Sequence, residues 1–200
     1  MKKLLMTLAL SLVMVACEKE ETEIDPKTLS VEDSYYKINP AELIGTCWRP
    51  SSESRHEIFD NNGKLVTVTS GDWIGDIYTS AVMKFDEDAI KCLEYYLQGR
   101  YAGELTVNYD INGNTIRFFT DKFDVQYTMF TKDIMLRCVS SQIVDIPYTT
   151  MGGVEMKEGY TKKSYRMMKK SSDDELERTL DLLYRNSIEV TAYDGHLLWL

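Results

Sequence analysis

Apolar and polar residues alternate through the middle of the chain, from about residue 57 to residue 169. In "LTVNYDI" (105–111) every second residue is apolar, and "FDVQYTM" (123–129) repeats the pattern. A period of two places the apolar side chains on one face of a β-strand, whereas a helix would scatter them around its axis. One apolar and one polar face is typical of an antiparallel sheet that is packed on one side.

Short turns separate these runs, among them "NGN" at 112–114, where Asn-Gly supplies the positive φ angles of a tight hairpin. Connections this short join only antiparallel neighbours. Eight or more such strands leave unpaired edges unless the sheet closes on itself. The pattern therefore predicts an all-β fold, an antiparallel up-and-down β-barrel of about eight strands, with an open two-sheet sandwich as the alternative. We expect strands near 44–49, 55–60, 64–69, 80–85, 89–97, 104–111, 115–120, 123–130, 134–140 and 162–169.

The period changes near the end of the chain, in "SSDDELERTLDLLYRN". Ser172 and Glu175 have the spacing of a capping box, in which each side chain bonds the other residue's backbone N–H. Four apolar residues then fall on one helical face: Leu176, Leu180, Leu183 and Tyr184. This predicts one C-terminal helix near 173–186, and the following segment 187–193 is expected to return as a strand that closes the sheet.

The chain begins with a different pattern, in which Lys2 and Lys3 precede twelve mostly apolar residues. This is the layout of an export signal, and it is too short for a membrane helix, which needs ~20 apolar residues. Ala16 followed by Cys17 resembles the lipobox of bacterial lipoproteins, although Met14 stands where that family usually has Leu. The resemblance implies a signal peptide over 1–16 and acylation of Cys17, with palmitate among the attached chains. An ordinary secretory leader with an incidental cysteine is the alternative.

The segment 17–38 is polar and rich in charge, which predicts a flexible tether between the acylated cysteine and a single folded domain over 39–200. Its run of acids resembles the signal that sends some Gram-negative lipoproteins to the outer face of the outer membrane: Glu18, Glu20, Glu21 and Glu23. The alternative is a solvated linker without a targeting role. The expected location is thus the outer membrane, through a lipid anchor.

Charge excludes one class of partner. The chain has 23 Lys and Arg against 32 Asp and Glu, a net charge of −9, and removal of the leader with its two lysines takes this to −11. Nucleic acid calls for a basic face, so we expect no nucleic-acid partner. Anionic headgroups would also repel this surface, so membrane attachment is expected to depend on the acyl chains.

Metal and cofactor chemistry find little support in the sequence. Cys47, Cys92 and Cys138 follow the leader, and an odd number allows at most one internal disulfide with one free thiol. The histidines are His56 and His196, and no Cys-x-x-Cys occurs, so neither a zinc site nor a cofactor is expected.

A family resemblance emerges from "NPAELIGTCW" (39–48), followed by a meander with "FDNNGK" and "YDINGNTI" hairpins and a late helix. Over 39–186 this pattern resembles the lipocalin-like lipoproteins of the calycin superfamily. The resemblance implies an eight-stranded barrel with Trp48 closing one end and a cup open at the other. Gly45 and Trp48 are three apart here, whereas the lipocalin signature spaces them by two, so in a regular strand they would face opposite sides unless a bulge intervenes.

The chain is not expected to be an enzyme, because His56 beside Ser54 or Asp60 lacks the sequence context of a nucleophile. The leading expectation is non-catalytic binding of a small hydrophobic ligand in an incompletely filled barrel. The alternative is a solid barrel whose loops contact another envelope protein or a host protein. The side chains expected to line the lumen are Tyr109, Phe118, Tyr127, Met129, Leu136, Tyr165 and Met167.

Overall fold

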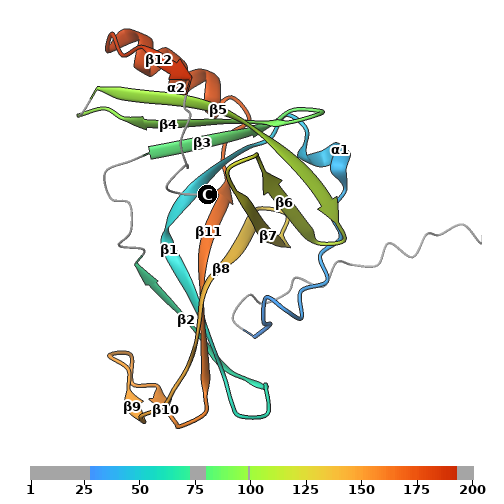
Figure 1. Cartoon of the computed structure of the whole chain (residues 1–200), viewed down its shortest axis with the longest axis vertical. Helices are drawn as coiled ribbons and strands as arrows, with labels where there is room; N and C mark the ends of the chain where they lie inside the picture. Colours follow the sequence, from blue (N-terminus) through green and yellow to red (C-terminus); the bar gives the residue numbers. More distant parts are fainter. Residues whose placement is uncertain (1–27, 73–79, 99, 193–200) are drawn as a thin grey trace, which may run out of the picture.

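Eight antiparallel strands form a closed barrel in the computed structural model, which describes residues 28–72, 80–98 and 100–192 (Figure 1). The strands follow one another around the ring in chain order, and the last strand pairs with the first to close it. The predicted up-and-down barrel is therefore confirmed. The barrel strands are β1 (Cys47–Phe59), β3 (Ser80–Phe85), β4 (Ile90–Tyr96), β5 (Tyr101–Asn112), β6 (Thr115–Phe119), β7 (Asp124–Thr131), β8 (Ile134–Ile143) and β11 (Thr161–Lys170).

The alternation that predicted the sheet is present in β5 and β7. Val107, Tyr127 and Met129 are buried in the barrel core, while the intervening Asn108 and Asp110 are exposed. Between β5 and β6 the chain reverses at Gly113, whose φ of 64° is the left-handed conformation that Asn-Gly hairpins use.

β1 corrects the predicted strand boundaries. The strands expected at 44–49 and 55–60 are one strand of 13 residues. Its pairing with β11 shifts register between Pro50 and Ser54. The polar residues 51–53, between the two apolar runs, thus form a bulge within one strand and not a loop between two strands.

Gly45 lies before this strand, at the end of the short helix α1 (Pro40–Leu43). Its φ of 84° turns the chain, and its N–H donates to the carbonyl of Phe85 at 2.8 Å. Since Gly45 is outside the strand, its spacing to Trp48 does not decide which way the indole points. Trp48 is fully buried in the barrel core.

Part of the sheet extends beyond the barrel as an arm (Figure 1). β1 pairs with β3 only at its first two residues and with β2 (Leu65–Asp72) from Glu53 onward. β8 pairs with β7 up to Leu136, and with β11 as far as Ile143. The arm is thus a four-stranded sheet in the order β2-β1-β11-β8, and β9 (Tyr148–Thr149) and β10 (Glu155–Met156) form a small hairpin at its end.

The predicted helix is present as α2 (Glu175–Arg185), which covers the outer face of β3, β4 and β5 (Figure 1). Leu176 and Leu183 are buried there against Val82 and Leu93. Tyr184, expected on the same apolar face, is instead 83% exposed.

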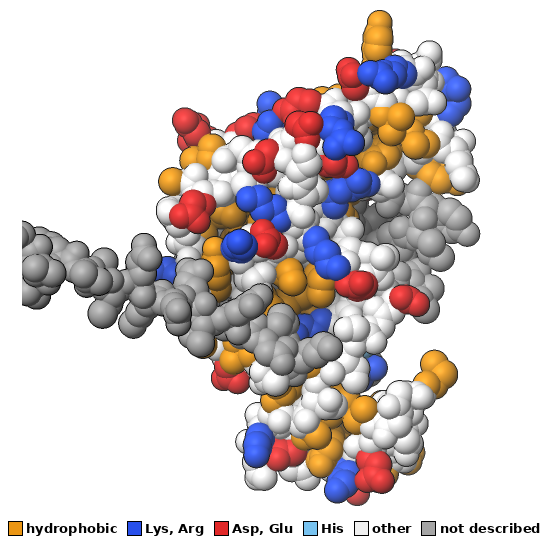
Figure 2. All heavy atoms as spheres, turned by 180° about the vertical axis from the view of Figure 1, so that it is seen from behind, with side chains coloured by type: hydrophobic (Ala, Val, Ile, Leu, Met, Phe, Trp, Pro, Cys, Tyr) orange, Lys and Arg blue, Asp and Glu red, His pale blue; other side chains and the backbone are white. Residues whose placement is uncertain are grey.

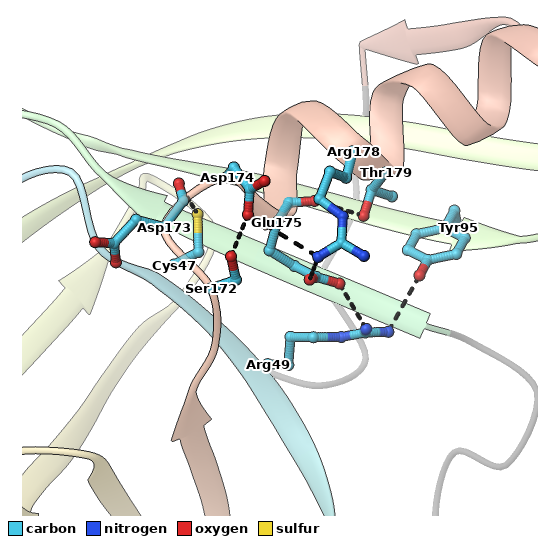
Figure 3. A network of polar contacts seen from close by, with 9 residues as sticks. All are labelled: Cys47, Arg49, Tyr95, Ser172, Asp173, Asp174, Glu175, Arg178 and Thr179. Carbon is cyan, nitrogen blue, oxygen red and sulfur yellow. Dashed lines mark hydrogen bonds and ion pairs between the residues drawn. The ribbon is translucent and has the colours of Figure 1, made fainter.

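The capping box predicted for this helix is wrong, because both of its side chains have other partners (Figure 3). The N-cap residue is Asp174, whose side chain makes no capping hydrogen bond, and the Ser172 hydroxyl bonds its carboxylate. Glu175 pairs with Arg49 of β1 at 2.7 Å, and the same guanidinium donates to the Tyr95 hydroxyl of β4 at 3.1 Å. These contacts tie the start of α2 to the barrel wall.

The segment after α2 does not close the barrel. β12 (Val190–Ala192) pairs parallel with β5 at Ala102–Glu104, while closure is made by β11 and β1. Residue 193, the last of the expected strand, lies outside the described residues.

The N-terminal part of the described chain packs on the barrel, although 28–38 was assigned to the flexible tether. Ser30, Val31, Ser34 and Ile38 are all buried. The folded part of the chain therefore begins before residue 39. The predicted signal peptide, Cys17 and the tether up to residue 27 lie outside the described residues.

Candidate functional site

The barrel interior was the predicted ligand site, and four of the predicted lumen residues meet there. Phe118, Tyr127 and Met129 are almost completely buried in one cluster, and Tyr109 packs against it. The rings of Phe118 and Tyr127 lie 5.3 Å apart, and those of Tyr109 and Phe85 also 5.3 Å. Burial raises the pKa of Tyr127 to about 12, as expected for a phenol removed from water. In this part of the barrel the side chains fill the interior.

The other three predicted lumen residues, Leu136, Tyr165 and Met167, form a different cluster with Phe130 and Val31. Met135 and Met168 pair across β8 and β11 and point into the barrel, so their sequence neighbours point outward. Both strands carry two consecutive apolar residues at this level, and alternation alone does not say which one faces inward.

The cluster of Leu136, Tyr165 and Met167 on the outside of the barrel is covered by residues 28–38, which we call the N-terminal segment. A buried ion pair holds this segment in place. Arg55 donates to the carboxylate of Glu57 at 2.8 Å, and the same carboxylate oxygen accepts the N–H of Val31 at 2.8 Å. Arg55 also donates to the carbonyl of Leu29. The sequence does not predict this pair, because alternating charges in a strand are usually solvated, and here they are buried only because the N-terminal segment packs over them.

Several strongly exposed apolar side chains lie at the end of the arm. We call residues 144–160 the tip hairpin. Ile143 lies at its base, and three apolar side chains of the hairpin project into solvent. Figure 2 shows hydrophobic side chains at the surface of this lower lobe. Their exposed fractions are 69% for Ile143, 79% for Ile146, 48% for Tyr148 and 109% for Met151.

The tip hairpin has its own packing and hydrogen bonds. Val144 and Met156 are buried against Ile58 of β1. The N–H of Val144 donates to the carbonyl of Tyr160 at 2.8 Å, which closes the base of the hairpin. Around Met151, Thr150 holds a tight turn by bonding the N–H groups of Gly153 and Val154 at 2.9 and 3.1 Å. Met151 is thus presented from a hydrogen-bonded turn.

His56 lies on the face of β1 opposite to Arg55 and Glu57, in a chain of hydroxyl groups. Ser54 donates its hydroxyl to the carbonyl of Gly71 at 2.9 Å, so its oxygen accepts from the imidazole Nε2–H at 3.1 Å. Nδ1 then accepts from the hydroxyl of Ser164 at 2.9 Å. Both imidazole nitrogens thus face serine hydroxyls, whereas a nucleophilic triad has a carboxylate on the nitrogen that does not face the nucleophile.

The histidine gives the protein a predicted pH dependence. Partial burial lowers the pKa of His56, and the charge of Lys162 lowers it further. In the unfolded chain His56 has an ordinary pKa of about 6.5, so near this pH the unfolded chain binds more protons than the folded protein. The contribution of neutral His56 to the free energy of unfolding is therefore complete above about pH 6.5, and it is lost as the pH falls toward the pKa of His56 in the folded protein. In urea unfolding at about pH 7.5 and about pH 5.5, wild type should lose more stability than His56→Gln. Equal losses would contradict this assignment.

The described residues hold no group of three or more His, Cys, Asp or Glu that could bind a metal ion. Cys47 and Cys92 are buried free thiols, and Cys138 is an exposed one. Within the same part of the chain, no helix has the length and apolar character needed to cross a bilayer.

No family model matches the chain, and a search of curated proteins finds no match. The resemblance to lipocalin-like lipoproteins therefore stays a prediction.

Proposed function

We propose that this protein is a non-catalytic interaction protein of the bacterial cell envelope, which contacts a partner protein through the tip hairpin of its arm. The observation that carries the proposal is the group of four exposed apolar side chains at the arm's end. Large apolar side chains left exposed together at one end of a folded protein mark a candidate contact site. The hydrogen bonds of the tip hairpin support this role, because a pre-ordered hairpin loses little entropy on binding.

Charge favours a protein over a lipid surface as the partner. Residues 143–160 carry Asp145, Glu155 and Glu158 against one cation, Lys157. Anionic headgroups would repel this end of the arm. A protein groove with an apolar floor and a rim of Lys and Arg complements it.

The packed interior supports an interaction role more than a ligand in the lumen. Phe85, Phe118 and Tyr127 occupy the centre of the barrel, each with no exposed surface. A small hydrophobic ligand at the same place would have to displace these rings. The barrel serves as a rigid base for the arm.

The envelope location rests on the leader and on Cys17. We propose a lipid-anchored protein of the outer membrane, with a barrel of the lipocalin-like type, held by the acyl chains on Cys17. Cys17→Ser should move the protein from the membrane fraction of its own cells to the soluble fraction. If Cys17→Ser stays in the membrane fraction, the lipid anchor on Cys17 is contradicted. The proposed role of the tip hairpin does not depend on this result.

The tip is tested by a double variant, Ile146→Ser/Met151→Ser, in the full-length tagged protein. Each truncated contact should cost about 1–2 kcal/mol, so the partner that co-purifies with wild type from the envelope should bind at least about tenfold more weakly. Val66→Ser and Tyr184→Ser remove exposed apolar side chains elsewhere and should leave binding unchanged.

Two results would overturn the role of the tip. In one, the double variant retains every partner of wild type at full affinity. In the other, purified wild type without acyl chains binds vesicles of phosphatidylethanolamine and phosphatidylglycerol, and the double variant does not, which would identify the tip as a lipid-binding element.

A further inference from the structure

A cavity of about 290 Å³ lies at the end of the barrel that α1 covers, away from the tip hairpin. Its volume is close to the lower limit for ligand pockets, ~300 Å³. At ~30 Å³ for each water, it has room for about ten water-sized volumes. Its lining comes from the segment before α1, from α1 itself, from the start of β1, from β7 and the turn that follows it, and from the end of β11.

The inner wall of this cavity is apolar and its polar atoms are already bonded. Ile38, Leu43, Trp48 and Met129 are buried members of the barrel core. The Trp48 Nε1–H donates to the Thr46 hydroxyl at 2.9 Å, and that hydroxyl donates to the carbonyl of Leu43 at 2.6 Å. The hydrogen-bond donors of Trp48 and Thr46 are therefore already used, and a ligand at this wall would make apolar contacts.

Lys132 and Lys170 lie on the rim of the cavity. Neither forms an ion pair with another residue that the structure describes. Lys170 pairs directly with Trp48 across β11 and β1, and directly opposed residues project to the same face of a sheet. Lys170 is thus an inward-facing cation above an apolar wall.

The rim also has two acids, Glu42 and Asp133. The carboxylate of Glu42 already accepts a hydrogen bond from the Asn39 amide at 2.7 Å, and among the described residues neither acid forms an ion pair with Lys132 or Lys170. The rim therefore carries two charges of each sign, and its two lysines can still bind an anionic group on a ligand.

We propose that this cavity binds a small amphipathic carboxylate, with an apolar body of fewer than about ten non-hydrogen atoms. The body lies against Leu43 and Met129, and the carboxylate lies between Lys132 and Lys170. This cavity shares no residue with the tip hairpin, so the proposal for one can be refuted while the proposal for the other stands.

Phenylacetate is the probe, titrated into the full chain with ¹³C-labelled methionine methyl groups. The Met129 methyl resonance should shift with saturation, while that of Met151 at the tip stays in place. 2-Phenylethanol, which has the same body without the charge, should bind at least about tenfold more weakly. Acetate, which has the charge without the body, should not saturate the site at ~10 mM.

The matched variants are Lys170→Met and Lys169→Met, since Lys169 is the next residue and pairs outside the cavity with Glu53 at 2.6 Å. Lys170→Met should weaken phenylacetate binding about tenfold, and Lys169→Met should not change it. The methionine spectra themselves report whether each variant is folded. The site is refuted by an unmoved Met129 resonance at ~10 mM phenylacetate, by equal affinity for 2-phenylethanol, or by equal losses in the two variants.

Discussion

Arg55→Met is expected to lower the free energy of unfolding by about 3–5 kcal/mol, because it leaves a buried carboxylate without its counter-ion. Arg55 is 5% exposed and Glu57 is completely buried, and they are joined at 2.8 Å. The substitution also removes the donor to the Leu29 carbonyl and the guanidinium that lies 4.6 Å from the ring centre of Phe130. The N-terminal segment would lose one of its polar attachments to the barrel, the hydrogen bond from Arg55 to Leu29.

The control is the double variant Arg55→Met/Glu57→Gln. It removes both charges and keeps a side-chain oxygen that can accept the N–H of Val31. Because the cost of the single change comes mostly from the unpaired charge, the double variant should be more stable than Arg55→Met. Urea unfolding followed by circular dichroism measures all three proteins. A single variant within about 1 kcal/mol of wild type, or a double variant with additive losses, would contradict the role of the pair.

Phe118→Ala is expected to cost a similar amount, about 3–5 kcal/mol, through the cavity it leaves in the barrel. Phe118 has no exposed surface, and its ring packs 5.3 Å from that of Tyr127 and 6.1 Å from that of Phe85. Buried aromatic rings in mutual contact contribute both transfer energy and ring–ring attraction.

Phe119→Ala is the matched control, since it is the same substitution one residue along β6 on the opposite face. Phe119 is only partly buried and lies beside Arg117, at 4.7 Å from guanidinium carbon to ring centre. Its loss should be clearly smaller in the same urea experiment. Equal losses at the two positions would mean that the interior is not more tightly packed than the outer face.

The sequence predicts this fold well where one face of a strand is polar. β5 and β7 alternate cleanly, so their inward residues, such as Val107 and Tyr127, could be assigned before the structure was known. Prediction failed where both faces are covered. In β8 and β11 the pairs Met135–Leu136 and Met167–Met168 are buried or half-buried on both sides, because the N-terminal segment packs on the outside.

Tertiary contacts explain the other errors. The local pattern at Ser172 and Glu175 fits a capping box, but Arg49 of a distant strand binds Glu175 instead. The tip hairpin was recognisable only as a segment too long for an ordinary hairpin loop, with Gly152 and Gly153 within it. Its apolar residues could not be identified as exposed, since exposure depends on how far the arm extends from the barrel.

We propose that a packed barrel presents the tip hairpin to a partner protein. A photoreactive amino acid placed at Met151 in living cells tests it most directly, with Val66 on β2 as the exposed control position. Position 151 should give one protein adduct of defined mass, which is absent from position 66 and is lost when Ile146 is also changed to serine. Adducts with lipid alone, or the same adducts from both positions, would contradict it.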